Sequence, residues 1–456
     1  MKPNMQYAIR NKLLLGIYVF ATVLAFIACD GGGGADIPTS IPLTDDEAVT
    51  ADAAALSADD FTYAGSDSSS HVAGNFIMPT SGANGTTISW VEMTDIYDNI
   101  ALTGEGNSEA ALSWTENNGF GPYTVAFIAT VKKGTVSTTK DISVTVHPPA
   151  TTKIAAMADG VTLKMVLVPG GLTFPTGVID DGTGTVTNAY FIGETEVTYE
   201  LWQKVCQWAI NNSYTFANPG RQGDNGSRGM QHPVTMVNCC DSMVWCNALT
   251  EWYNAMKGTN YECVYTYNNA IIRDSQDSNA TACYGAVASS TAKGFRLLTS
   301  NEWELAARYR GTNTTNVVTT PINGINFGAM ALKWTKGNSA SGATTYYNDN
   351  LEGAGQPGKS ANDAVAVYSL YWNGGSWQST GVNSTAAVKC KAANALCLYD
   401  MSGNVYEWCF DLKGANRVRR GGRWSYTANF LQVGEWGVCD QDYEDYDLGF
   451  RFAKTQ

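Results

Sequence analysis

Short runs that alternate apolar and polar residues dominate the chain between residues 58 and 147. Four of them occupy 87–91, 111–114, 123–131 and 142–146, and each has the composition of a β-strand. The sequence KKG at 132–134, between the last two runs, is typical of a hairpin turn. Strands at this spacing predict an antiparallel β-sandwich over 58–147.

The apolar pattern takes a helical period in three places after residue 152. The first helix is predicted to start near Tyr199, and the second to run from Asp241, as its N-cap, to a stop at Gly258. A third begins at Thr299, because a threonine followed three residues later by Glu302 forms a capping box. Short strands and long loops make up the rest. We therefore predict an α+β domain over 152–456, with its tryptophans and cysteines holding the loops in place.

The N-terminus carries basic residues followed by an apolar run over 13–27. Such a run is too short for a comfortable membrane span but suits the core of a signal peptide. The run ends in FIAC at 26–29, which resembles a bacterial lipobox and implies a lipid on Cys29. We predict a lipoprotein signal peptide over 1–28 and a flexible linker over 29–57. A plain signal peptide with a chance cysteine is the alternative.

Composition and charge limit the compartment and the partners. Acidic residues outnumber basic ones by 42 to 29, and the formal net charge is −13. This balance excludes nucleic acid as the main partner, because phosphate binding needs clustered Lys and Arg. The three histidines argue against a His-rich zinc site, and eleven cysteines suit an oxidising compartment. We expect a cell-envelope protein held at the outer-membrane surface by its lipid anchor.

Six motifs follow one another in the C-terminal region in an informative order. They are GETEVT at 193–198, QHPV at 231–234, FRLLTSNEWE at 295–304, LYDMSGNVYEW at 398–408, RVRRGGRW at 417–424 and LGFR at 448–451. Together they resemble the formylglycine-generating enzyme, or sulfatase-modifying factor, family over about 160–453. The resemblance implies a variant of the C-type lectin fold. The preceding region over 58–147 resembles the Ig-like modules of bacterial surface proteins, which usually act as spacers.

The family's enzymes oxidise a cysteine of a sulfatase, and the resemblance implies two active-site cysteines shortly after the Arg-Gly-Gly motif. In this sequence the two positions fall at Tyr426 and Leu431, neither of which can form a thiolate or bind copper. Cys439 is the only thiol nearby, and it lies outside that spacing. We therefore expect no catalytic residues, no copper and no oxidase activity. An oxidase with an altered active site that uses Cys439 is the alternative.

Residues 423–447 mix aromatic and acidic side chains between two motifs that look structural. From Ser425 to Asp447 the chain has six acidic residues, no basic residue and no clear period, which predicts an irregular loop. Aromatic residues with polar neighbours on a rigid scaffold form recognition surfaces at low entropic cost. The predicted ligand-binding residues are Arg423, Ser425, Tyr426, Thr427, Phe430, Glu435, Trp436, Asp440, Asp442, Tyr443, Asp445 and Tyr446. We expect Tyr426→Ala and Trp436→Ala to leave folding intact.

The same segment resembles the variable region of the Treponema variable proteins, which are lipid-anchored targets of a diversity-generating retroelement. The resemblance implies that residues 423–447 vary between copies and bind a ligand without catalysis. The acidic and aromatic mixture favours a cationic or hydrogen-bonding partner, such as a protein patch or a glycan. An ordinary surface loop, or a structural envelope protein without a specific ligand, is the alternative.

A calcium site is also implied by the family resemblance. It falls on the side chains of Asp400 and Glu407 and on the backbone carbonyls of Gly403 and Val405, and Ca²⁺ there would be structural. The alternative is that Asp400 caps a turn and Glu407 pairs with an arginine such as Arg420.

Ten cysteines lie in the C-terminal domain, an even number that does not by itself fix their connectivity. We expect a Cys263–Cys283 disulfide, because these two residues flank one Asn/Ser-rich insertion. The adjacent Cys239 and Cys240 suggest a metal or redox motif, but separate partners or buried thiols are favoured because no Cys/His pair lies at ligand spacing.

Overall fold

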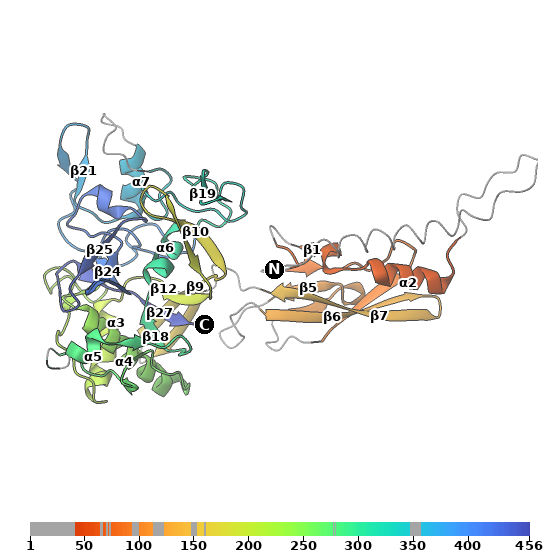
Figure 1. The fold of residues 1–456 in the computed structure, drawn as a ribbon, viewed down its shortest axis with the longest axis horizontal. Helices are drawn as coiled ribbons and strands as arrows, with labels where there is room; N and C mark the ends of the chain where they lie inside the picture. Colours follow the sequence, from red (N-terminus) through yellow and green to blue (C-terminus); the bar gives the residue numbers. More distant parts are fainter. Residues whose placement is uncertain are drawn as a thin grey trace, which may run out of the picture.

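The computed structural model describes residues 42–456, apart from 64–66, 70–71, 73, 94–99, 113–122, 147–152, 159–160, 277, 279 and 347–356. The predicted signal peptide over 1–28 and the predicted lipid-bearing Cys29 therefore lie outside the described residues. Figure 1 shows an N-terminal domain of β-strands and one helix, in red to orange, and a mixed C-terminal domain, in yellow to blue.

The N-terminal domain is a β-sandwich, as predicted. One sheet has the strand order β1-β2-β5-β4 and the other β3-β6-β7, with antiparallel pairing in both. The strands are β1 (Thr62–Tyr63), β2 (Phe76–Ile77), β3 (Thr87–Glu92), β4 (Ile100–Thr103), β5 (Glu109–Leu112), β6 (Tyr123–Lys133) and β7 (Val136–Val146). One buried cluster joins the two sheets, and the rings of Phe76 and Phe127 meet edge to face at 5.9 Å across it. The predicted KKG turn does connect β6 to β7, with Gly134 at φ 57°.

The prediction of a flexible linker over 29–57 is wrong for its second half. Residues Asp45–Ala55 form helix α2, which begins at a capping box between Thr44 and Glu47. The helix contacts β6 and β7 and buries Val49 and Ala53 in the sandwich core. Its small alanines resemble a linker in composition, but they also let a helix pack closely on a sheet. The 3₁₀ turns of this domain are η1 (Ala58–Asp60) and η2 (Glu105–Asn107).

A five-stranded sheet in the order β18-β27-β12-β9-β8 lies at the centre of the C-terminal domain. Its strands are β8 (Lys153–Ala158), β9 (Val161–Val168), β12 (Tyr190–Gly193), β18 (Phe295–Leu297) and β27 (Phe452–Thr455). The last strand of the chain thus pairs with β12 near the start of the domain and with β18 from its middle. This arrangement closes the domain, so the segment that precedes β27 is held against the scaffold.

The predicted helices are present, with one changed boundary. They are α3 (Tyr199–Ile210), α4 (Cys239–Lys257) and α6 (Ser300–Arg308), and the Thr299–Glu302 capping box is confirmed. Helix α4 begins earlier than predicted, because Asn238 is its N-cap and Asp241 is the third residue of a capping box. Gly258 ends it in the left-handed conformation, at φ 68°.

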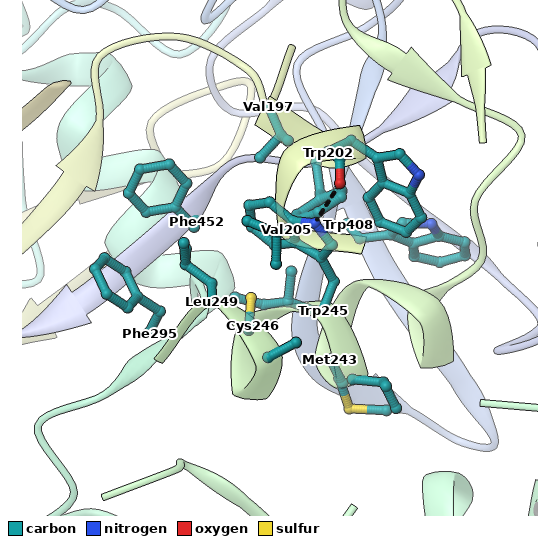
Figure 2. Packing of buried hydrophobic residues seen from close by; sticks show 14 of the residues in the cluster. Val197, Trp202, Val205, Met243, Trp245, Cys246, Leu249, Phe295, Trp408 and Phe452 are labelled. Atoms are coloured by element: carbon teal, nitrogen blue, oxygen red, sulfur yellow. Dashed lines mark hydrogen bonds between the residues drawn. The ribbon is translucent and has the colours of Figure 1, made fainter. Parts of the chain in front are cut away.

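The core between these helices and the central sheet is aromatic. Trp202 of α3 and Trp245 of α4 stack at 5.9 Å, and the Trp245 ring nitrogen donates to the Trp202 carbonyl at 3.2 Å (Figure 2). Phe450 meets both rings edge to face. Trp202 and Trp245 are therefore part of the core of the domain.

The second sheet of this domain has the order β25-β24-β23-β26 and positions the candidate site. Its strands are β23 (Tyr406–Lys413), β24 (Asn416–Arg420), β25 (Trp436–Cys439) and β26 (Leu448–Gly449), and only the β23–β26 pair is parallel. The remaining elements are β10 (Leu172–Thr176), β11 (Gly182–Val186), β13 (Arg221–Gln222), β14 (Val234–Thr235), β15 (Tyr265–Tyr267), β16 (Ala270–Ile271), α5 (Ala280–Tyr284), β17 (Val287–Ala288), β19 (Pro321–Ile322), β20 (Ile325–Asn326), α7 (Pro357–Val365), β21 (Leu370–Trp372), β22 (Trp377–Ser379) and η4 (Ala428–Leu431).

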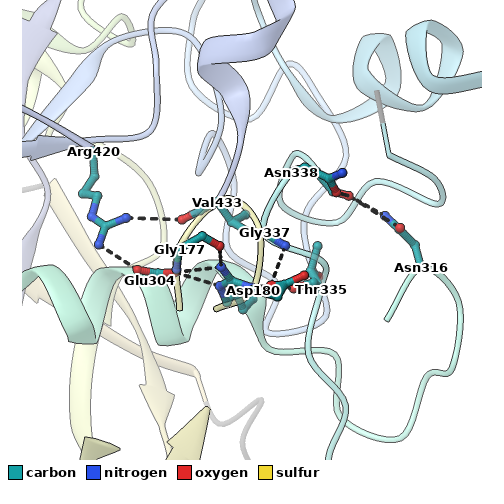
Figure 3. A network of polar contacts seen from close by, with 11 residues as sticks. Gly177, Asp180, Glu304, Asn316, Thr335, Gly337, Asn338, Arg420 and Val433 are labelled. Atoms are coloured by element: carbon teal, nitrogen blue, oxygen red, sulfur yellow. Dashed lines mark hydrogen bonds and ion pairs between the residues drawn. The ribbon is translucent and has the colours of Figure 1, made fainter. Parts of the chain in front are cut away.

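Buried charge networks hold the long loops, a role that the sequence assigned to tryptophans and cysteines alone. Arg308 is fully buried and pairs with Glu304 at 2.8 Å and Asp180 at 2.6 Å, and it donates to the Gly177 carbonyl at 2.6 Å. Arg420 pairs with the second oxygen of Glu304 at 2.7 Å (Figure 3). Each of these buried charges has a partner of opposite sign, which offsets the cost of removing it from water. The ion pairs therefore fix the positions of the loops that carry them.

The predicted Cys263–Cys283 disulfide is wrong in this structure. All ten cysteines of the C-terminal domain are free thiols, and Cys263 donates to the carbonyl of Asn247 at 3.5 Å. Cys239 and Cys240 are buried thiols in the first turn of α4, in agreement with the favoured interpretation.

Candidate ligand-binding site

The two ends of the segment 423–447 are fastened to each other. The Arg423 guanidinium pairs with the buried Asp447 at 2.6 Å and with Asp445 at 3.3 Å. The Ser425 hydroxyl donates to the other oxygen of Asp447 at 2.7 Å. Since both ends meet at one buried carboxylate, the segment has a fixed base although it contains long irregular stretches.

The first third of the segment is packed rather than displayed. The Tyr426 ring is half-buried between Phe430, at 4.8 Å, and Tyr406, at 6.1 Å, and the Arg423 guanidinium lies 3.6 Å from its centre. Leu431 is buried in a small apolar cluster that also contains Tyr368 and Ala428. Tyr426 is therefore half-buried rather than a surface residue, and its three ring or cation contacts argue against the expectation that Tyr426→Ala leaves folding intact.

The middle of the segment forms a strand, which corrects the prediction that it is irregular throughout. Strand β25 pairs with β24, so Val438 lies opposite Val418 and Trp436 lies opposite Arg420. Alternation then exposes Trp436, at 46%, and Val438 on one face, with the Lys413 ammonium 5.5 Å from the Trp436 ring. The strand gives this tryptophan a rigid support at the edge of the sheet.

The last third, over 440–446, is an exposed loop, as predicted. Tyr443 and Tyr446 are 42% and 43% exposed, and Asp440 and Asp442 are also exposed. The Tyr443 hydroxyl donates to Asp445 at 2.8 Å, and this bond raises the pKa of Tyr443 to about 12, so the phenol stays neutral.

Backbone hydrogen bonds fix this loop to the start of helix α4. The amide of Met236 donates to the Asp445 carbonyl at 2.9 Å, and that of Cys239 to the Gln441 carbonyl at 3.1 Å. A polar hollow of about 480 Å³ lies beside the loop, lined by Asp442 and Glu444 together with residues that include Asn218 and Asn238. The loop therefore presents aromatic and acidic side chains from a fixed backbone.

The structure divides the twelve predicted residues into two groups. The exposed ones are Trp436, Asp440, Asp442, Tyr443 and Tyr446, and the half-buried ones are Arg423, Ser425, Tyr426, Thr427, Phe430, Glu435 and Asp445. We refer to the exposed five as the display residues and to the half-buried seven as the supporting residues.

A hairpin that the sequence analysis missed lies beside the segment. Strands β21 and β22 pair Trp372 with Trp377, whose rings meet at 5.5 Å, and Trp377 is 41% exposed. The amide of Ser369, just before β21, donates to the Tyr426 carbonyl at 3.0 Å. The sequence NGG at 373–375, between two aromatic runs, is a hairpin signal that could have identified it.

Cys439, the thiol of the enzymatic alternative, is half-buried on β25. Burial raises its pKa, although Arg419 and Arg423 act in the opposite direction. A thiol with a raised pKa is a poor nucleophile and a poor metal ligand near neutral pH.

The predicted calcium ligands are only partly suited to an ion. Asp400 and Glu407 are close enough for Glu407 to contribute to the raised pKa of Asp400, whose main cause is burial. The Glu407 carboxylate, however, already accepts two hydrogen bonds from Arg451, at 2.6 and 2.7 Å, and one from the Trp303 ring nitrogen at 2.8 Å. Calcium would have to share this carboxylate with the Arg451 guanidinium. The four residues therefore do not form the calcium site that the resemblance implies.

The alternative that Glu407 pairs with an arginine is confirmed, but that arginine is Arg451, because Arg420 pairs with Glu304. Within the described ranges, no group of three or more His, Cys, Asp or Glu side chains is placed to hold a metal ion. Calcium binding at these four residues is therefore untested, and the Glu407–Arg451 pair argues against it.

Comparison with known families assigns both domains. The model of the sulfatase-modifying factor enzyme 1-like domain matches residues 152–456, and that of the atrophied bacterial Ig domain matches residues 49–149. The chain belongs to the sulfatase-modifying factor enzyme 1-like family. Its C-terminal domain has the C-type lectin-like fold expected from the six motifs, preceded by an Ig-like domain.

Three individual relatives each cover about two thirds of this chain. "Chaperone protein LppX" from Paenibacillus barcinonensis is 26% identical in an alignment of 313 residues that covers 64% of this chain and 89% of that protein. Treponema denticola variable protein 1 is 27% identical, with a TM-score of 0.46, over 67% of this chain and 99% of its own. PvdO from Pseudomonas aeruginosa is 18% identical, with a TM-score of 0.40, over 67% and 99%.

Proposed function

We propose that this sulfatase-modifying factor family member is a non-catalytic, lipid-anchored binding protein of the cell envelope. The ligand contacts are made by the display residues Trp436, Asp440, Asp442, Tyr443 and Tyr446. The observation that carries the proposal is their placement: three large aromatic side chains are 42–46% exposed on a backbone that is fixed by strand pairing and by bonds to α4. Exposed aromatics on a rigid support lose little entropy on binding.

The environment of the reactive positions supports a non-catalytic role. The family's two cysteine positions fall on Tyr426, which is packed against Arg423, and on Leu431, which is buried in an apolar cluster. Burial raises the pKa of Cys439, which leaves little thiolate for copper or oxygen chemistry. No helix among the described residues is long and apolar enough to cross a membrane, so attachment through Cys29 is part of the proposal.

The ligand is a cationic or hydrogen-bonding partner, a protein patch or a glycan. Asp440 and Asp442 are exposed beside the aromatic rings, and the segment after Arg423 has no basic residue. Lysine and arginine groups bind both aromatic faces and carboxylates. The segment 423–447 is the proposed target of retroelement diversification, because the fastened base leaves the display residues free to change.

Two experiments test this function. Sequencing the gene across one population should find substitutions concentrated in the codons of the display residues, whereas an even spread over residues 152–456 would contradict diversification. Purified protein should leave a sulfatase-motif peptide unconverted in the presence of copper. Formylglycine formation that is lost in Cys439→Ser would establish the oxidase alternative instead.

A further inference from the structure

Two hollows in the surface meet beside the exposed loop over 440–446. The polar hollow of about 480 Å³ next to this loop continues into a second hollow of about 490 Å³ along helix α3. Both are lined by Ala217, Asn218 and Gln276, so together they form one continuous groove, which we call the α3 groove. Each half by itself has the volume of a ligand site.

The half of the groove along α3 is apolar and aromatic. Its lining includes Tyr199, Ile210 and Phe216, and Ile210 is 66% exposed. The Phe216 ring meets Trp202 edge to face at 5.6 Å, and the Trp202 ring nitrogen donates to the Pro219 carbonyl at 2.9 Å. The core therefore holds this wall in place, and a partner that removes its exposed side chains from water gains free energy.

The half beside the loop has hydrogen-bonding groups that the protein does not use. Asn238 is 3% exposed, and its side-chain nitrogen has no acceptor among the described residues. The Asn218 side-chain nitrogen donates to Asp241, which leaves the Asn218 side-chain oxygen without a donor in the same ranges. The exposed Asp442 carboxylate also has no hydrogen-bond or ion-pair partner in the part of the chain that the structure describes. One donor, one acceptor and one negative charge therefore line the same hollow.

A buried carboxylate fixes the backbone where the two halves meet. Asp241 is 0% exposed and accepts from the Ala217 amide at 3.0 Å and from the Asn218 side chain at 2.8 Å. It also accepts from the Ser275 hydroxyl at 2.6 Å and belongs to the capping box that begins α4. The groove is therefore formed before a ligand arrives, and binding has few protein groups to order.

We propose that the α3 groove binds an extended segment of a protein partner. A lysine or arginine of that segment pairs with Asp442, and a large apolar side chain packs against Ile210 and Phe216. The inference rests on the proposed binding function, and it decides between the two ligand classes in favour of protein. It also adds contact residues that lie outside the segment 423–447.

The chemistry of the two halves favours a peptide over a glycan. A peptide backbone supplies both an acceptor for the Asn238 nitrogen and a donor for the Asn218 oxygen. A basic side chain makes charge-assisted hydrogen bonds to Asp442, which are stronger than the bond from a neutral hydroxyl. A saccharide would place hydroxyl groups against Ile210 and Phe216, and burying a hydroxyl without a partner costs free energy.

The test selects peptides on the full-length chain. A phage library of random linear peptides is panned against the immobilised protein, and the enriched peptides are synthesised and measured by fluorescence anisotropy. We expect them to share a lysine or arginine and a large apolar residue at a constant separation. Replacing either residue of the peptide by serine should weaken binding about tenfold.

Variants of the chain assign the two ends of the peptide. Asp442→Asn should weaken the selected peptide about tenfold and remove the preference for a basic residue. Ile210→Gln should weaken it to a similar degree and remove the preference for an apolar residue. Ile179→Gln, at a position that is 77% exposed and lines neither hollow, is the control and should bind as the wild type does. All three variants should keep the wild-type Tm, because the substituted side chains are exposed.

The outcomes separate the groove from the proposed function. Selection without enrichment, or enriched peptides that bind Asp442→Asn and Ile210→Gln as tightly as the wild type, would overturn the groove. A glycan array probed with the same protein tests the other ligand class. Glycan binding that Tyr443→Ala abolishes and Ile210→Gln leaves unchanged would support the display residues and overturn the groove. Peptide binding that both groove variants weaken, and that Tyr443→Ala and Trp436→Ala leave unchanged, would support the groove and contradict the role of the exposed rings.

Discussion

The sharpest test of the division between supporting and display residues compares Tyr426→Ala with Trp436→Ala. The first variant loses two aromatic contacts, at 4.8 and 6.1 Å, and a guanidinium contact at 3.6 Å. Aromatic pairs contribute about 0.5–1.5 kcal/mol each and a cation contact about 0.5–1 kcal/mol, so the expected loss is about 1.5–4 kcal/mol. Trp436 is 46% exposed and has one cation contact with Lys413, so its removal should cost under about 1 kcal/mol.

Thermal unfolding followed by circular dichroism measures the difference without depending on the tryptophan that is removed. At about 2–4 °C per kcal/mol, the Tm of Tyr426→Ala should fall by roughly 3–16 °C and that of Trp436→Ala by less than about 4 °C. Ligand binding should show the reverse order once each variant is measured well below its Tm. Equal Tm shifts, or a larger one for Trp436→Ala, would refute the division.

Three further predictions concern the buried charges. Arg451→Leu leaves Glu407 buried without its cation and should lower the free energy of unfolding by about 3–5 kcal/mol, measured by urea denaturation. Arg228→Leu, in a partly exposed pair with Asp224, should leave the free energy of unfolding almost unchanged in the same measurement. Similar losses in the two variants would mean that Arg451 is not essential to the core. Burial raises the pKa of Asp400 from 3.8 to about 6, so the folded state holds this proton more tightly and wild-type stability falls as the pH rises from about 4 to 6. Asp400→Asn has no carboxyl group at this position, so its stability lacks this pH dependence. The unfolding free energy of the variant minus that of the wild type should therefore rise by up to about 3 kcal/mol between about pH 4 and 6. If that difference were the same at both pH values, the pKa of Asp400 would not be raised. Because Arg451 already neutralises Glu407, we expect the Tm in millimolar Ca²⁺ to equal the Tm in EDTA. A higher Tm in Ca²⁺ that is lost in Asp400→Asn would instead establish the predicted calcium site.

The sequence predicted those features whose signals lie within a few residues of one another. The capping box from Thr299 to Glu302, the stop at Gly258 and the turn at Gly134 were each visible in adjacent residues, and the structure has all three. The alternating runs between 87 and 146 likewise predicted the sandwich. The order of the six motifs predicted the family and, through it, the fold.

Only the tertiary structure decided which residues meet across long distances in the chain. Glu407 pairs with Arg451 and Arg420 pairs with Glu304, because the folding of distant segments onto one another sets these contacts. For the same reason, the aromatic and acidic composition of 423–447 identified a candidate surface but could not separate the packed Tyr426 from the exposed Trp436. Burial depends on the neighbours that packing supplies, and sequence spacing does not contain them.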